Sequence, residues 1–184
     1  NSDGSKLDRK VVCLSAGTAA VHVALLACGV GSGDEVCVQS FTFCASSHPI
    51  TYLGASPVFI DSEKETWNMD PALLEKAIVE RKEKTGKYPK AIVPVALYGM
   101  PYKVDEIMAI ADKYGIPVVE DAAEGMGSRF NGQVLGTFGN IYAAHLKGAE
   151  FTSYLMAKYT EASQHGFWQF EDYPFACTYP LERG

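Results

Sequence analysis

Asp121 closes an apolar segment, and a carboxylate in that position needs a partner. Residues 116–121 read Ile-Pro-Val-Val-Glu-Asp, and a run rich in Val and Ile is typical of an interior strand of a parallel sheet. Ligands of such sheets bind at the carboxyl ends of the strands, where Asp121 would lie. Two interpretations stay open on this segment alone: Asp121 caps the following turn or helix, or it binds a cationic group.

A second segment has the composition of a phosphate-binding turn. The turn Ser-Ala-Gly-Thr at 15–18 joins an apolar run at 11–15 to a stretch rich in Ala, Val and Leu at 19–28. A strand that enters a helix through small residues presents free backbone N–H groups and the positive end of the helix dipole, which together bind phosphate. The alternative is an ordinary helix cap, since Ser and Thr are common N-cap residues.

Taken together, the two segments suit pyridoxal phosphate. An ionised Asp121 would keep the ring nitrogen of this cofactor protonated, so that the ring can accept electrons, and the turn at 15–18 would bind its phosphate. A nucleotide-binding dehydrogenase is a weaker alternative, because such an enzyme would have Gly-x-Gly-x-x-Gly after its first strand, and residues 15–20 lack those glycines.

The elements that would position these residues alternate along the chain. Strands are predicted at 11–15, 35–39, 57–61, 90–97 and 116–121, and helices at 19–28, 42–53, 70–84 and 104–113. This alternation predicts an α/β fold with a mostly parallel sheet and helices on both faces. Asp70 and Pro71 form a helix-start signal, and the pair Asn131-Gly132 between apolar flanks predicts a hairpin.

Composition excludes several classes of partner. With 184 residues, 47% of them hydrophobic, the chain can bury the core of one ordinary domain. Its formal net charge of -6 argues against nucleic acid or an anionic membrane as a partner, and no apolar run is long enough to span a bilayer. We therefore expect a cytoplasmic protein. Five cysteines without a Cys-x-x-Cys pair indicate reduced thiols and no metal site.

Several blocks in a fixed order give the chain a family resemblance. They include Leu-Ser-Ala-Gly-Thr-Ala-Ala at 14–20, Ser-Phe-Thr-Phe-Cys-Ala-Ser at 40–46, Trp-Asn-Met-Asp-Pro at 67–71, Glu-Asp-Ala-Ala-Glu at 120–124 and Gly-Thr-Phe-Gly at 136–139. Over about residues 11–140 the chain resembles nucleotide-sugar aminotransferases of the DegT/StrS type. These belong to the fold-type I pyridoxal phosphate enzymes, so the resemblance implies the large domain of that fold, in incomplete form.

The resemblance implies roles for five residues. Gly17 and Thr18 would bind the cofactor phosphate, mainly through backbone N–H groups, and Phe43 would stack on the pyridine ring. Asp121 would pair with the ring nitrogen. Glu124 stands where the family usually has Gln or His near the ring, and an ionised Glu cannot donate the hydrogen bond that those residues can. Without the resemblance, Phe43 would be assigned to the core and Glu124 to the surface.

The family pattern breaks down after Gly139. Family members continue to a Ser-Phe-x-x-x-Lys block whose lysine binds the cofactor covalently, whereas this chain has neither Ser-Phe nor a glycine-rich stretch there. Lys147 is the candidate Schiff-base lysine, but it lies too close to the Phe-Gly turn, and a solvated surface lysine is the alternative. His145 would suggest a pyridoxal phosphate-dependent sugar dehydratase, although its spacing fails as well.

We therefore divide the chain into an aminotransferase-like portion at 1–140 and a divergent segment at 141–184. The origin of the second segment stays open between a frameshifted or truncated gene, a diverged replacement and a joined sequence that lacks internal segments. The resemblance implies amino transfer from glutamate to a keto nucleotide-sugar, with a nucleotide-sugar and an amino acid as substrates and a homo-oligomeric enzyme. Without the lysine block, slow or absent turnover is expected. The alternative is a non-catalytic fragment or assembly module of the same family.

Overall fold

A computed structural model describes residues 14–125 and 127–144 of the chain. The α-helices are α1 (Gly17–Ala27), α2 (His48–Tyr52), α3 (Pro71–Thr85) and α4 (Val104–Tyr114), and two 3₁₀ turns are η1 (Cys44–Ser46) and η2 (Leu97–Gly99). The strands are β1 (Glu35–Gln39), β2 (Ser56–Ile60), β3 (Ala91–Val93), β4 (Val119–Ala122), β5 (Arg129–Phe130), β6 (Gln133–Val134) and β7 (Ile141–Ala144).

Five of these strands form a parallel arrangement in the order β2-β1-β3-β4-β7. Strand β1 pairs with β2 and β3, and β4 pairs with β7, all in parallel. Two isolated parallel bridges, Ile92 to Val118 and Val95 to Asp121, connect β3 to β4. Since β7 pairs with β4 from Ile141 onward, this sheet extends past residue 140 to Ala144.

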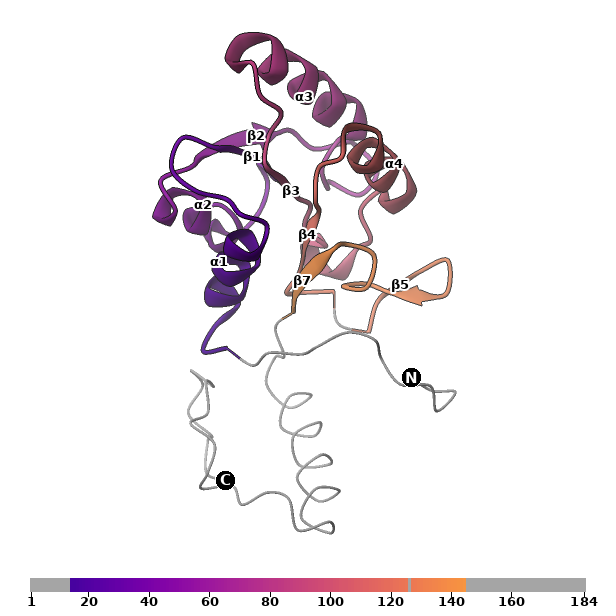
Figure 1. The fold of residues 1–184 in the computed structure, drawn as a ribbon. Coiled ribbons are helices and arrows are strands. Elements are labelled where there is room, and N and C mark those ends of the chain that lie inside the picture. The colour runs from indigo at the N-terminus through magenta and orange to yellow at the C-terminus, as the bar shows by residue number, and fades with distance from the viewer. Residues whose placement is uncertain (1–13, 126, 145–184) are drawn as a thin grey trace.

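Helices cover both faces of the sheet, as the alternation of elements predicts. Helices α1 and α2 lie on one side and α3 and α4 on the other (Figure 1). Strand β1 shows how the sequence serves both faces: Val36 and Val38 belong to the core under α1 and α2, while Cys37 between them belongs to the core under α3 and α4. Side chains alternate between the two faces of a strand, so an uninterrupted apolar strand builds two cores.

Local signals explain where several elements begin and end. The Asp70 carboxylate accepts hydrogen bonds from the backbone N–H groups of Ala72 and Leu73, which caps α3, and Gly86 ends that helix in the left-handed conformation. Asn131 and Gly132 both have positive φ angles, 48° and 81°, in the turn that joins β5 to β6. Both the helix start and the hairpin predicted from sequence are confirmed.

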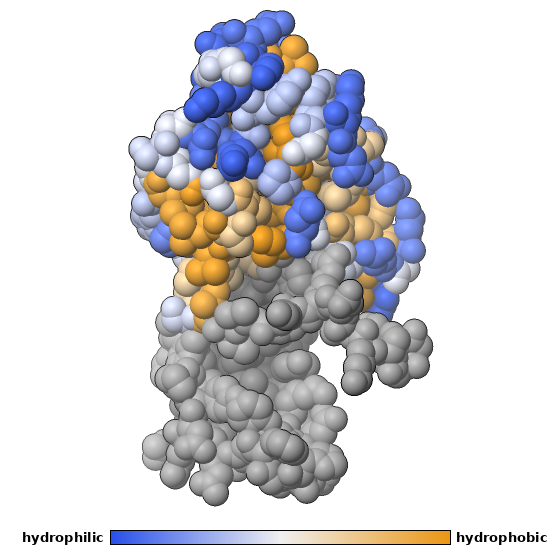
Figure 2. All heavy atoms as spheres, viewed as in Figure 1, coloured by the Kyte–Doolittle hydropathy of each residue, from blue (hydrophilic) through white to orange (hydrophobic). Residues whose placement is uncertain are grey.

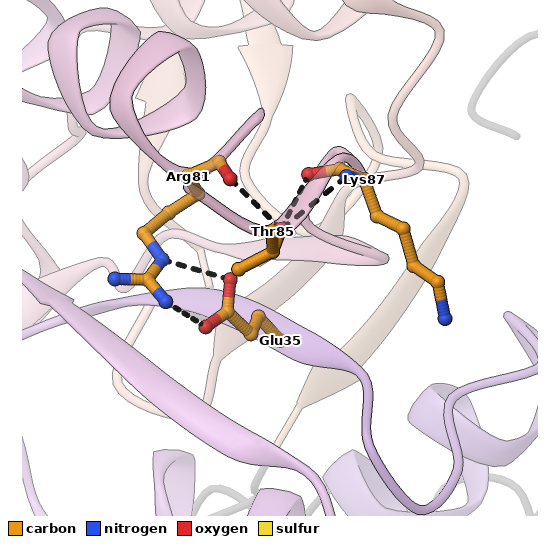
Figure 3. Close-up of polar contacts among 4 residues, drawn as sticks. All are labelled: Glu35, Arg81, Thr85 and Lys87. Atoms are coloured by element: carbon orange, nitrogen blue, oxygen red, sulfur yellow. Dashed lines mark hydrogen bonds and ion pairs between the residues drawn. The ribbon is translucent and has the colours of Figure 1, made fainter. Parts of the chain in front are cut away.

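The amino-terminal edge of the sheet is fixed by polar contacts with α3 (Figure 3). The Arg81 guanidinium points at Glu35 at the start of β1, and its Nε donates to the Glu35 carboxylate at 2.9 Å. Thr85 Oγ1 lies 2.8 Å from the carbonyl oxygen of Arg81 and accepts a hydrogen bond from the Lys87 backbone N–H. These contacts attach the carboxyl end of α3 to β1, at the edge opposite to Asp121.

Other predicted elements differ in extent. The helix expected at 42–53 is divided into η1 and α2, and Pro49 lies in the first turn of α2, where its missing N–H group is tolerated. The strand expected at 90–97 has regular pairing only at Ala91–Val93. The strand predicted at 11–15 falls largely outside the described residues. No helix within the described ranges is long and apolar enough to cross a membrane.

Candidate functional site

Asp121 lies in β4 at the carboxyl edge of the sheet, and its side chain is buried, with 5% of its surface exposed. Its backbone is fixed by β-type hydrogen bonds to Pro94 and Ala96 on the neighbouring segment. The carboxylate has two donors: the Ser46 hydroxyl at 2.6 Å and the Ala123 backbone N–H at 3.2 Å. Asp121 is therefore held in place, and its contact with the Ala123 N–H caps the turn that follows, as one of the two sequence interpretations has it.

The loop after β1 supplies the hydroxyl that contacts Asp121. Ser46 is itself buried, and its oxygen lies 2.8 Å from Thr42 Oγ1. Because the Ser46 hydroxyl donates to the carboxylate, the Thr42 hydroxyl is left to donate to Ser46. Sequence reasoning missed Ser46 and Thr42 as site residues, and the only available signal was their place in the block at 40–46.

Phe43 lies between these two hydroxyl residues, and it is not a core residue. It is 77% exposed, at the N-cap position of η1. An aromatic ring left in solvent is available to stack on a planar ligand. Phe43 is linked to Asp121 through Ser46, whose backbone N–H donates to the Phe43 carbonyl oxygen and whose hydroxyl donates to the Asp121 carboxylate.

The electrostatic environment of Asp121 lacks a cation within the described residues. Burial raises the pKa of its carboxyl above the ordinary value, the hydrogen bonds from Ser46 and Ala123 lower it, and the nearby charge of Glu124 raises it. None of the ion pairs found across 14–125 and 127–144 includes Asp121. A buried carboxylate in such surroundings would be stabilised in its ionised form by any cationic group that bound against it.

The first turn of α1 lies at the same edge. Helix α1 contacts η1, β4 and β7, and Figure 1 shows that it begins at the end of the molecule where β7 finishes. Its N-cap residue, Ala16, makes no side-chain hydrogen bond to the helix, and the first turn has no acidic residue. Among the described residues, no atom lies within 4 Å of a Cβ placed at Gly17. Gly17 and Thr18 thus lie in an open, uncapped first turn of the kind that can bind an anion.

Glu124 supports a neighbouring turn. One of its carboxylate oxygens accepts a hydrogen bond from the Tyr98 backbone N–H at 2.6 Å. Tyr98 has a positive φ angle of 53° and is followed by Gly99 with 81°. A Cβ at Gly99 would lie 3.1 Å from the Glu124 carbonyl oxygen, so the two segments approach closely. Glu124 therefore stabilises the turn at 97–99, a structural role that was not predicted from the sequence.

Glu120, another residue missed by sequence reasoning, anchors the turn before β7. Its fully buried carboxylate accepts hydrogen bonds from the backbone N–H groups of Gly136, Phe138 and Gly139 at 2.7–3.2 Å. Gly139 must be small, because a Cβ there would lie 2.9 Å from the Val118 carbonyl oxygen. Adjacent residues of β4 therefore have separate tasks: Glu120 fixes the entry to β7, and Asp121 lies on the opposite face at the candidate site.

The remaining predicted site residue, Lys147, lies outside the described residues, as does His145. Their predicted roles stay predictions. Across the described part of the chain, no cluster of three His, Cys, Asp or Glu side chains could hold a metal ion.

Comparison with characterised proteins places this geometry in a family. The model of the DegT/DnrJ/EryC1/StrS aminotransferase family matches residues 6–145. Over 133 residues the chain is 50% identical to EpsN of Bacillus subtilis, which is named as a candidate pyridoxal phosphate-dependent aminotransferase. Over 123 residues it is 46% identical to the UDP-2-acetamido-2-deoxy-3-oxo-D-glucuronate aminotransferase of Pseudomonas aeruginosa.

The two alignments cover 72% and 66% of this chain, but 34% and 32% of the relatives. The crystal structure of a DegT DnrJ EryC1 StrS aminotransferase from Brucella abortus superposes with a TM-score of 0.68 at 38% identity, over 70% of this chain and 34% of that one. The chain thus spans about a third of the length of these relatives. The resemblance and the fold class predicted from sequence are confirmed, and the chain belongs to the DegT/DnrJ/EryC1/StrS aminotransferase family.

Proposed function

We propose that this chain forms the cofactor-binding part of a pyridoxal phosphate-dependent aminotransferase that acts on a nucleotide-linked keto sugar. Membership of the aminotransferase family supports the reaction class. The printed activity of the Pseudomonas aeruginosa relative, which acts on a UDP-linked oxo sugar, supports the substrate class. When bound, pyridoxal phosphate supplies an electron sink that stabilises a carbanion next to the amino nitrogen.

The observation that carries the proposal is the buried carboxylate of Asp121 without a cation among the described residues. Desolvation of an unpaired carboxylate is unfavourable, and the chain nevertheless fixes it with the Ser46 hydroxyl and the Ala123 N–H. A protonated ring nitrogen placed against Asp121 would provide the opposite charge. In this assignment Ser46 is a positioning residue, because it orients the carboxylate and lowers its pKa.

Other residues at this edge of the sheet could make the remaining contacts with the cofactor, to its phosphate and to its ring. The open first turn of α1, with Gly17 and Thr18, would bind the phosphate through backbone N–H groups. The exposed ring of Phe43 would cover one face of the pyridine and fix its orientation. We also propose that Glu124, whose carboxylate is engaged by Tyr98, supports this edge of the site through the turn at 97–99.

We propose Lys147, the first lysine after Gly139, as the candidate for the covalent lysine. Since the Ser-Phe-x-x-x-Lys block is missing there, we expect the chain to bind the cofactor and to turn over slowly or not at all. Reduction with borohydride in the presence of pyridoxal phosphate, followed by peptide mapping, tests this. A modified Lys147 together with measurable transamination would contradict the slow-turnover expectation.

Self-association is also part of the proposal. Hydrophobic side chains gather on the face formed by α1 and α2 (Figure 2), and the large exposed ones there are Val23, Leu26 and Tyr52. Burial of such residues against a second copy would be favourable. A non-catalytic assembly module of the same family is the second candidate function, which the missing lysine block favours. It predicts oligomers that form without any binding of pyridoxal phosphate.

The decisive experiment compares cofactor binding to the intact chain, to Asp121→Asn and to Asp112→Asn. The last variant makes the same chemical change at an exposed position of α4. Equilibrium dialysis with pyridoxal phosphate should show binding to the intact chain and to Asp112→Asn, and binding weakened at least about tenfold in Asp121→Asn, because a charge-assisted contact is lost. Equal binding by all three proteins would refute the assignment of Asp121.

A further inference from the structure

A hollow that none of the predicted contacts uses lies at the carboxyl ends of β1 and β2. It has a volume of about 390 Å³, and the residues that line it are Phe41, Asp61, Ser62, Glu63, Lys64 and Trp67. Two of them are aromatic and exposed to solvent, Phe41 by 45% and Trp67 by 62%. Their ring centroids are 5.9 Å apart and the ring planes are inclined by 57°. The lining of the hollow therefore combines two aromatic rings with polar side chains.

Trp67 is held in an unfavourable backbone conformation. Its φ angle of 64° lies in the left-handed region, which a bulky side chain rarely adopts. A residue kept in this region needs surrounding contacts that impose the conformation, and such residues cluster at binding sites. The conformation of Trp67 must therefore be imposed by its neighbours, and its exposed ring is a candidate for ligand contact.

The contacts that impose it come from both sides of Trp67. On one side, the buried Glu63 carboxylate accepts hydrogen bonds from the backbone N–H groups of Glu65 and Thr66 and from the Thr66 hydroxyl. On the other side, the buried Asn68 side chain accepts from the Leu97 N–H and donates to the Met100 carbonyl.

Gln39 at the end of β1 completes the arrangement. Its amide donates to Asn68 and to the Phe41 carbonyl oxygen, and it accepts from the Met69 N–H. One buried amide therefore fixes the backbone next to both rings. The loop around Trp67 is built on the ends of the strands and presents its ring to solvent in a fixed place.

The same loop that carries Phe41 also carries the contacts of Asp121. Residues 40–46 lead from Phe41 through Phe43 to Ser46, whose hydroxyl donates to Asp121. The hollow and the candidate cofactor site are thus neighbours along one short segment at the carboxyl edge of the sheet, where ligands of parallel sheets bind.

The charges around the hollow decide which part of a ligand it suits. Asp61 and Glu63 outnumber Lys64, so the lining has a formal charge of -1 and does not favour a diphosphate. The inclination of 57° between the rings prevents both from stacking on one flat base. An aromatic face beside carboxylate oxygens suits a ring with apolar C–H faces and hydroxyl donors.

We propose that the hollow bounded by Phe41 and Trp67 binds the uncharged, hydroxyl-bearing sugar ring of the nucleotide-linked substrate. This inference rests on the proposed function and adds a recognition site to it. Trp67 provides the stacking face, Phe41 the second wall, and Asp61, which is exposed, an acceptor for sugar hydroxyls.

Tryptophan fluorescence tests the inference, because the chain has two tryptophans, Trp67 and Trp168. In the Trp168→Phe protein, Trp67 is the sole reporter. UDP-N-acetylglucosamine should change its emission in a saturable way, whereas UDP alone should leave it unchanged at the same concentrations. Equal responses to both compounds would show that the nucleotide, and not the sugar, contacts Trp67, and would overturn the inference.

The Trp67→Gly variant removes the ring without opposing the backbone, since glycine adopts positive φ freely. Calorimetric titration should show UDP-N-acetylglucosamine binding at least about tenfold weaker than in the intact chain, as for removal of a stacked aromatic anchor. Pyridoxal phosphate binding and the unfolding midpoint should stay as in the intact chain. Unchanged affinity for UDP-N-acetylglucosamine overturns the inference, and so does the absence of any sugar-nucleotide binding by the intact chain. The cofactor titration judges the proposed function separately.

Discussion

Replacing Asp121 by Asn should stabilise the cofactor-free chain at neutral pH. Burial raises the pKa of the Asp121 carboxyl, so the folded state favours the protonated form. For such a group the contribution to stability is complete below the ordinary aspartate pKa of about 3.9, and it is lost as the pH rises through the raised pKa of the folded state. Asn is neutral at all these pH values and avoids this loss.

The structure sets the size of the effect. An unpaired buried carboxylate costs several kcal/mol, of which the hydrogen bonds from Ser46 and Ala123 recover a part. The Asn side-chain oxygen can still accept from Ser46, but its NH₂ group faces the Ala123 N–H, so this hydrogen bond is lost at a cost of about 1 kcal/mol. The balance predicts that Asp121→Asn has a free energy of unfolding about 1–3 kcal/mol above that of the intact chain at pH 7.

Urea denaturation of both proteins at pH 4 and pH 7 measures this difference. The advantage of Asp121→Asn should shrink as the pH falls to 4, because the raised pKa favours protonation of Asp121 in the folded chain. Pyridoxal phosphate at 100 times its dissociation constant for the intact chain should add about 2.7 kcal/mol to the intact chain and about 1.4 kcal/mol to a variant that binds it tenfold more weakly, so the cofactor should narrow or remove the advantage of the variant. A variant less stable than the intact chain at both pH values, or stabilised equally by the cofactor, would refute the reasoning.

Three further predictions follow from named contacts. Glu120→Gln should lower the free energy of unfolding by about 2–4 kcal/mol and speed hydrogen exchange at Gly136, Phe138 and Gly139, because Gln cannot accept from all three N–H groups. Gly139→Ala should cost about 1–3 kcal/mol by overpacking, measured by urea denaturation, whereas Gly17→Ala, in open space, should cost less than about 0.5 kcal/mol. Alkylation at pH 8 followed by mass spectrometry should show that the exposed Cys44 reacts and that pyridoxal phosphate slows its reaction. Cys37 should react only after unfolding, because burial and the charge of Glu35 raise its pKa to about 12.

The sequence allowed the layers of the fold to be predicted because local signals and burial agree there. Apolar runs such as the one ending at Asp121 form strands, and Asp70, Gly86 and Asn131 act at the ends that their chemistry favours. The helix expected at 42–53 was wrong in extent. Ser46 turns inward to contact Asp121, and a contact across 75 residues leaves no periodic signal in the segment itself.

The candidate site could be predicted only in part for the same reason. Asp121 could be predicted as a site residue because it is a carboxylate at the end of an apolar run. The role of Glu120 beside it could not be predicted, since its partners are backbone N–H groups 16 to 19 residues away. The conformation of Trp67 was likewise not predictable, because it depends on contacts of Glu63 and Asn68 in its own loop and of Gln39, which lies 29 residues before Asn68.

The central claim is that the Asp121 carboxylate receives the protonated ring nitrogen of pyridoxal phosphate. Nitrogen-15 NMR of the cofactor labelled at the ring nitrogen, bound to the intact chain at pH 8, measures this protonation directly. The claim predicts a protonated ring nitrogen in the intact chain and in Asp112→Asn, and an unprotonated one in any cofactor that Asp121→Asn retains. A ring nitrogen in the same protonation state in all three proteins would contradict it.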